Sequence, residues 1–264
     1  MLIDAHAHVD SYDEMLEAAL AEIRERRILT ISTAMDLPSY TRASEIGDRC
    51  EFVLPAFGVH PWKAPAHVNC LEELRETLEH SPMLGEIGLD YHNVKDASQY
   101  PAQRTVFEFF LQAAGEQDKI VNLHTTGAEE EVLNLIARYS VRRGIVHWYS
   151  GPLETLQEMI AYGLYFTIGV EVLHTEYIRT IAQTVPSAQL LTETDNPGGA
   201  QGYTGAPGMP RAIEDVVSAL AELQRVTPDA VERTVQANFA RLIRDDARFT
   251  GIQRRFFDGT HLGT

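Results

Sequence analysis

Two histidines two residues apart occur in the segment IDAHAHVD, residues 3–10, near the start of the chain. Side chains alternate across a strand, so a strand here places His6 and His8 on one face with Asp4 and Asp10, and only apolar residues on the other. Histidines are a costly way to fill a core, because each buried imidazole needs a hydrogen-bond partner. The pair therefore indicates metal binding if further ligands exist elsewhere.

Further histidines and acids fall at or near the ends of other short apolar segments. They are His60 after FVLPAFGV, Glu86 in LGEIGLD, His124 in IVNLHT, His147 in GIVHWY and Asp195 at the end of LLTETD. Imidazole and carboxylate ligands together suit Zn, Mn, Fe or Co, and sites richer in oxygen suit Mg. We therefore predict a metal centre assembled from several segments of the chain.

Segments that read as strands alternate with segments of helical periodicity. The eight predicted strands are 2–9, 28–34, 52–59, 83–89, 120–125, 144–149, 164–169 and 189–194. The predicted helices are 13–27, 67–80, 102–117, 128–142, 152–162, 174–184 and a closing block, 210–243, with a turn near Thr227-Pro228. This alternation predicts a single-domain (β/α)8 TIM barrel of the α/β class, with its active site at the carboxyl ends of the strands. An open doubly wound sheet is disfavoured, because no Gly-rich turn follows the first strand.

The barrel is predicted to span residues 1–244, and residues 245–264 read as a charged, aromatic C-terminal tail packed on the surface. The formal net charge of -16 gives no basic footprint for duplex DNA. No apolar run reaches membrane-spanning length, and a strand at residues 2–9 argues against a secretory signal. Cys50 and Cys70 suit a reducing compartment, so we expect a cytoplasmic protein. We also expect no association with a membrane and no obligate protein partner.

The number of candidate ligands indicates two metal ions. Four histidines and two carboxylates exceed one tetrahedral catalytic site, which takes three protein ligands. Two ions roughly 3.5–4 Å apart would accommodate them all. The predicted assignment is Glu86 as the bridge, His6, His8 and Asp195 on one ion, and His124 and His147 on the other. Whether one or two ions bind, and whether they are Zn, Mn or Mg, stays open at this point.

Six motifs occur in a fixed order: DAHAHVD, AFGVHPW, GEIGLDY, NLHTTGAEEEVL, VHWYSG and LLTETDNP. Through them the chain resembles, from about residue 2 to 197, the TatD family of metal-dependent hydrolases and DNases within the amidohydrolase superfamily. The resemblance implies a (β/α)8 barrel with one or two divalent metal ions, and activity as a 3′–5′ exonuclease, as another DNase or on small phosphate esters. It also carries the metal ligands over to the same six residues.

Four more residues are candidates around the centre. The resemblance places His60, the histidine of GVHP, in the substrate pocket, although it could instead pack beneath the residues that follow it. Tyr91 and Tyr149 follow ligand-bearing strands and are predicted substrate contacts. Glu193 shares a strand face with Asp195, so it either orients a ligand from behind or forms a structural hydrogen bond to the barrel.

One departure from the family concerns the loop after the eighth strand. Typical family nucleases carry an Arg- and Asn-rich loop there, whereas this chain has NPGGAQGYTGAPGMPRAIED, with Arg211 as its only basic residue. The leading prediction is a deoxyribonuclease or phosphodiesterase acting on single-stranded DNA or a small phosphate ester. A metal-bound hydroxide would attack phosphorus. Asp195 and Glu86 are the predicted catalytic residues, with Asp195 as the general base. The altered loop favours the alternative, an amide, lactone or ester hydrolase with the same centre. A non-catalytic binding protein is disfavoured by the complete ligand set.

Overall fold

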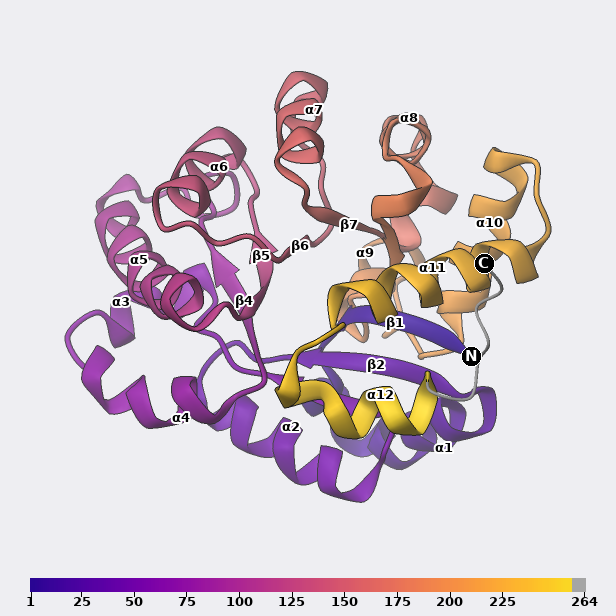
Figure 1. Ribbon diagram of the computed structural model, residues 1–264, viewed down its shortest axis with the longest axis horizontal. Coiled ribbons are helices and arrows are strands. Elements are labelled where there is room, and N and C mark those ends of the chain that lie inside the picture. Colours follow the sequence, from indigo (N-terminus) through magenta and orange to yellow (C-terminus); the bar gives the residue numbers. More distant parts are fainter. Residues whose placement is uncertain (258–264) are drawn as a thin grey trace.

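The structure, a computed structural model, describes residues 1–257 and contains eight parallel strands at its centre with helices outside them (Figure 1). The strands are β1 (Leu2–Ala7), β2 (Ile28–Thr33), β3 (Val53–Ala56), β4 (Met83–Gly88), β5 (Ile120–His124), β6 (Gly144–Val146), β7 (Tyr165–Ile168) and β8 (Leu190–Thr192). Each of the eight predicted strands is present, and each is shorter than predicted. The chain forms a single-domain (β/α)8 barrel, as the alternation of segments predicted.

The strands pair in two parallel ladders, β1-β2-β3 and β4-β5-β6-β7-β8. A single bridge between Phe57 and Leu84 joins the first ladder to the second. At the other junction, between β8 and β1, backbone hydrogen bonds just beyond β8 are joined by side-chain contacts. The backbone N–H and the hydroxyl of Thr194 both donate to the carboxylate of Asp4, at 2.8 and 2.7 Å. Asp4 therefore helps to close the barrel beneath the histidines of β1.

Helices cover the outside of the strands in sequence order. They are α1 (Leu16–Arg26), α2 (Leu37–Arg49), α3 (Ala64–His67), α4 (Arg75–His80), α5 (Tyr100–Gln117), α6 (Glu129–Arg138), α7 (Leu153–Tyr162), α8 (Glu176–Thr184), α9 (Gly198–Thr204), α10 (Ala212–Gln224), α11 (Pro228–Leu242) and α12 (Thr250–Phe256). The predicted closing block divides into α10 and α11 where the turn was expected, because Thr227 caps α11 and Pro228 takes its first position. No helix within residues 1–257 is both long and apolar enough to cross a membrane.

Two predicted helices differ from the structure. The predicted helix 67–80 overlaps α3 only at His67 and consists mainly of a 3₁₀ helix, Leu71–Leu74, followed by α4, because the backbone at Cys70 is not helical. The predicted helix 13–27 starts later, at Leu16, since the preceding residues form a 3₁₀ helix. Neither change alters the set of barrel strands.

The end of the described chain packs against the barrel. Phe249 is fully buried and belongs to the main core, and the Phe256 ring of α12 lies 5.1 Å from that of Phe52. Phe256 also packs against the second core cluster, which includes Ile23 of α1 and Ile46 of α2, so the part of the predicted tail that the structure describes is held to the barrel by apolar contacts. α12 (yellow) lies near the C-terminal end of the coloured chain in Figure 1. The rest of that tail, residues 258–264, lies outside the described residues.

Candidate metal centre

The six predicted ligands come together at the carboxyl ends of the strands, and His60 lies among them. They fall into three overlapping groups, each with ligand atoms within 4.8 Å of one another: His6, Glu86 and His147; His6, His8 and Asp195; and His60, Glu86 and His124. Residues from six different strand ends thus share one small volume. Such an arrangement is typical of barrel active sites, which are built from several strands at this face.

Local backbone geometry turns two ligand segments toward the centre. Asp195 and Trp148, the residue after His147, both adopt left-handed backbone conformations, with φ of 53° and 41°. Residues other than glycine seldom adopt this conformation, and such strain is often found at functional sites. The backbone N–H of Asp195 donates to the carbonyl of His6 at 2.9 Å, which fixes the end of β8 beside β1.

Side chains behind the two histidines of β1 orient their rings. Nδ1 of His6 lies 2.8 Å from Oδ1 of Asn122, whose amide donates to the Ala5 carbonyl, so Asn122 is fixed and His6 donates from Nδ1. Nδ1 of His8 lies 3.0 Å from the carbonyl oxygen of Thr33. In each ring Nε2 is left facing the carboxylates of the centre. Hydrogen bonds of this kind usually set the tautomer of metal-binding histidines.

Glu193 performs the same task for His147. Its Oε2 lies 2.9 Å from Nδ1 of His147, and its Oε1 accepts from the backbone N–H of Trp148 at 2.9 Å. Glu193 is fully buried. The sequence left two roles open for it, and in this position the orientation of a ligand and the hydrogen bond to the barrel coincide.

Glu86 lies between two sets of histidines. Its Oε2 is 3.5 Å from Nε2 of both His6 and His8, and its Oε1 is 3.5 Å from Nε2 of His147 and 2.7 Å from Nδ1 of His124. Burial would raise the pKa of Glu86, but the surrounding histidines outweigh it and hold the pKa well below the usual value. An ionised carboxylate with its two oxygens directed to different histidines has the shape of a bridging ligand.

Asp195 is the carboxylate of the centre that reaches solvent. Its side chain is 24% exposed, whereas that of Glu86 is 2% exposed. Oδ1 of Asp195 lies 3.3 Å from Nε2 of His8. Burial would raise the pKa of Asp195, but the contact with His8 and the charges of neighbouring histidines lower it below the usual value. Asp195 is therefore an ionised acceptor at the mouth of the centre.

His60 contacts the carboxylate of Glu86 directly, in addition to its predicted place in the substrate pocket. Its Nε2 is 3.4 Å from Oε1 of Glu86, and its ring centroid is 4.8 Å from that of His124. Its Nδ1 accepts from the backbone N–H of Trp62 at 3.2 Å. Burial lowers the pKa of His60, which favours the neutral ring. The residue thus both packs against Trp62, which was one of its predicted roles, and faces Glu86.

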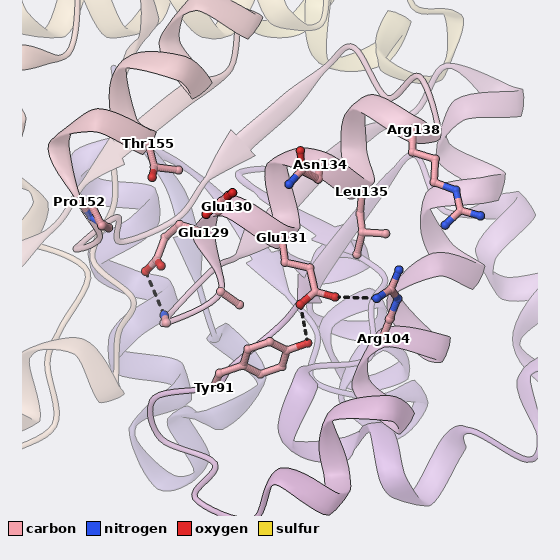
Figure 2. Close-up of a pocket in the computed structure, with 12 residues that line it drawn as sticks. Tyr91, Arg104, Glu129, Glu130, Glu131, Asn134, Leu135, Arg138, Pro152 and Thr155 are labelled. Atoms are coloured by element: carbon pink, nitrogen blue, oxygen red, sulfur yellow. Dashed lines mark hydrogen bonds and ion pairs between the residues drawn. The ribbon is translucent and has the colours of Figure 1, made fainter.

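The two tyrosines predicted as substrate contacts lie further out. Tyr149 is buried in the core, and its hydroxyl donates to the Pro152 carbonyl. Tyr91 stacks on Tyr100 with a centroid separation of 4.0 Å and donates to Glu131 at 3.1 Å. Tyr91 lines a separate cavity of about 660 Å³ between the ends of α5, α6 and α7, which Figure 2 shows with Glu131 held between Tyr91 and an arginine of α5. None of the six predicted ligands lines that cavity.

Two further residues hold the site in place, and neither was predicted from the sequence to do so. Asp90 is fully buried, and its Oδ2 lies 3.1 Å from Nε2 of His124. Asn122, which orients His6, lies two residues before His124 on β5. The alternation that grouped His6 with His8 places Asn122 on the same strand face as His124, so that signal was present. Asp90 follows the end of β4, where alternation no longer applies.

The donor set fits divalent cations. Among residues 1–257, every ion pair of Glu86 and Asp195 is with a histidine, and none is with lysine or arginine. Buried carboxylates need a counter-charge. In the metal-free protein the histidines supply it: burial would lower the pKa of His124, but its hydrogen bonds to Asp90 and Glu86 outweigh burial and raise the pKa to about 9. Divalent cations would supply the same counter-charge. Nitrogen and oxygen ligands in this mixture are those that Zn, Mn and related ions take. The site therefore has the chemistry of a metal centre, without specifying which metal.

Comparison with known proteins places the chain in a family. A family profile described as TatD related DNase matches residues 3–244. The chain is 29% identical over 261 residues to the uncharacterized metal-dependent hydrolase YabD of Bacillus subtilis, covering 92% of this chain and 99% of YabD. It is 22% identical over 213 residues to human deoxyribonuclease TATDN3, covering 74% and 78% of the two chains.

A solved structure supports the same assignment. The crystal structure of YjjV, a TatD homologue from Escherichia coli, matches with a TM-score of 0.83 at 27% identity, covering 91% of this chain and 97% of YjjV. The family profile, in turn, spans nearly all of the described barrel. This protein therefore belongs to the TatD related DNase family of metal-dependent hydrolases.

Proposed function

We propose that this protein is a divalent-metal-dependent phosphodiesterase that hydrolyses single-stranded DNA from its 3′ end. The observation that carries the proposal is the pair of carboxylates at the centre: Glu86 is buried between two sets of histidines, and Asp195 reaches solvent beside them. Glu86 would thus act as a ligand alone, whereas Asp195 would both hold an ion and accept a proton from water. The deoxyribonuclease name of the human relative supports DNA as the substrate class.

The proposed ligand assignment follows the contacts of Glu86. His6, His8 and Asp195 would hold one ion, and His124 and His147 the other, with Glu86 between them. Bound divalent ions would supply Lewis-acid polarisation of the phosphoryl group and positive charge opposite the negative charge that develops on it. His60 faces Glu86 from the same side as His124 and is a further candidate ligand.

Asp195 has the position of a general base. Its partly exposed carboxylate is ionised, so it can accept a hydrogen bond from a water molecule and take its proton as the oxygen attacks phosphorus. The P–O bond to the leaving group then breaks, and the leaving oxygen takes a proton from solvent. His8, 3.3 Å from Oδ1 of Asp195, holds the carboxylate in this orientation.

A second candidate is hydrolysis of a small ester or lactone at the same centre. The loop after β8, which in typical family nucleases carries cations, forms α9 from the residues GGAQGYT. Its one basic residue, Arg211, lies outside this helix and its exposed guanidinium comes within 4.0 Å of Glu22 on α1. This loop therefore offers no cation to grip a phosphate, which favours a substrate with less negative charge.

One assay separates the two candidates. Protein loaded with Mn, Mg or Zn is incubated with 3′-labelled single-stranded DNA, a non-nucleotide phosphodiester and a lactone. A His6→Ala, Asp195→Ala double variant controls for contaminating nucleases. Shortening of the DNA from its 3′ end by the wild type alone supports the phosphodiesterase. Turnover of the lactone alone contradicts it and supports the second candidate.

A further inference from the structure

We propose that Trp62 is a stacking platform for a nucleobase at the mouth of the metal centre. The inference rests on the proposed function, because it concerns the part of a DNA substrate next to the scissile phosphate. Trp62 follows β3 and its side chain is 51% exposed. Base stacking would make Trp62 a determinant of substrate specificity and not a catalytic residue.

The indole of Trp62 is fixed in place despite its exposure. Its Nε1 donates to Oδ2 of Asp90 at 2.6 Å, and its ring lies edge-on to His60, with centroids 4.7 Å apart and an interplanar angle of 81°. Asp90 is itself held, because it accepts from the backbone N–H of Asn93 at 2.7 Å. With the only polar atom of the indole satisfied, what remains in solvent is apolar ring surface, and little freedom is lost when a flat ligand covers it.

The platform is directly connected to the metal centre. Oδ2 of Asp90, which accepts from Trp62, also lies 3.1 Å from Nε2 of His124. His60, which touches the same indole, lies 3.4 Å from Glu86. Only Asp90 therefore lies between the Trp62 ring and His124, and only His60 between the ring and Glu86. A base stacked on Trp62 would have its own phosphate on the side of these ligand groups.

The surroundings explain why stacking is needed here. The described residues include four exposed large hydrophobic side chains, and three of them, Trp62, Tyr177 and Tyr203, follow β3, β7 and β8 on the side of the metal centre. The loop after β8 supplies no cation for the phosphate backbone, as described above. Stacking on an aromatic ring is independent of charge and tolerates every base, so it can supply affinity that the missing cations do not.

The test compares two variants that both lose the N–H donated to Asp90. Trp62→Phe keeps an aromatic ring, and Trp62→Leu does not. Binding of thymidine 5′-monophosphate and of deoxyribose 5-phosphate, which lacks the base, is measured by calorimetry on the metal-loaded proteins. We expect wild type and Trp62→Phe to prefer the nucleotide by about 10-fold, within the range that stacking of one base provides, and Trp62→Leu to bind both equally.

A kinetic arm separates this inference from the proposed function. Oligonucleotides with a normal or an abasic 3′-terminal nucleotide are compared in the nuclease assay. Equal binding of the nucleotide by Trp62→Phe and Trp62→Leu overturns the platform, whatever the activity. If no phosphodiester is cleaved but the binding difference between the two variants persists, the platform stands and the proposed function fails.

Discussion

Oε2 of Glu193 lies 2.9 Å from Nδ1 of His147, while Oε1 of the same carboxylate accepts from the backbone N–H of Trp148 at 2.9 Å. One buried acid thus fixes both the ring of a candidate ligand and the left-handed backbone that follows it. The His147 ring also stacks on that of His6, with centroids 3.6 Å apart. Glu193 therefore fixes one predicted ligand directly, and the stacked rings couple the position of that ligand to the position of a second one.

Glu193→Gln is expected to weaken metal binding by about 10-fold, and Glu193→Ala by up to about 100-fold, the usual range for a residue that orients a histidine ligand. Glutamine retains an acceptor for one of the two donors but loses the charge that pairs with His147. Calorimetric titration with Zn or Mn measures the affinity. Glu193 has no positioning role if Glu193→Ala binds metal as tightly as wild type.

Asp195→Asn is expected to keep the fold and much of the metal affinity while losing at least about 100-fold in kcat, the scale of general-base loss. The amide is isosteric with the carboxylate but cannot take a proton from water. Turnover and bound metal are measured on the same sample. Asp229→Asn, the same change at an exposed position at the start of α11, is the matched control and should leave both unchanged. Full activity of Asp195→Asn with metal bound would remove Asp195 from the proposed mechanism.

Much of the barrel could be predicted from sequence, because short apolar strands and periodic helices are local patterns. The candidate ligands could be proposed for the same reason: His6 and His8 were expected on one strand face, and each other candidate lies at or near the carboxyl end of a strand. The residues that orient those ligands are harder to find, because their contacts join distant parts of the chain, as Asn122 and His6 do across 116 residues. Local patterns also gave no sign that the Tyr149 ring turns into the core, where its hydroxyl is satisfied by a backbone carbonyl.

Metal binding should raise the thermal midpoint of the protein. A ligand present at 100 times its Kd stabilises the folded state by about 2.7 kcal/mol, which is about 5–10 °C for a chain of this size. Differential scanning calorimetry with and without Zn or Mn measures the shift. Glu86→Gln should remove most of it, because the candidate bridge loses its charge, while His80→Gln, at an exposed histidine of α4, should retain it. An equal shift in Glu86→Gln would place the metal elsewhere.

The buried carboxylate of Asp246, outside the metal centre, links the C-terminal segment to the barrel and should make stability depend on pH. Its Oδ2 lies 2.7 Å from Nη2 of both Arg143 and Arg248, and its Oδ1 accepts from Nε of Arg248 at 2.7 Å. Burial would raise the pKa of Asp246, but the hydrogen bonds from the two arginines outweigh it and lower the pKa. Because the folded state holds this proton less tightly than the unfolded state, the carboxylate stabilises the fold at neutral pH.

Asp246→Asn is therefore expected to lower the free energy of unfolding at pH 7 by about 1.5–3 kcal/mol, the range for hydrogen bonds to charged groups. The difference from wild type should persist down to about pH 4, near the pKa of an unfolded aspartate, and should shrink below it as the wild-type carboxylate takes up its proton. Urea unfolding of the metal-free proteins across this pH range measures it without a contribution from metal release. Asp245→Asn is the matched control, because Asp245 is exposed and its left-handed backbone, φ 61°, suits asparagine equally well. A constant difference between Asp246→Asn and wild type from pH 7 to pH 3 would show that Asp246 acts through packing and not through its charge.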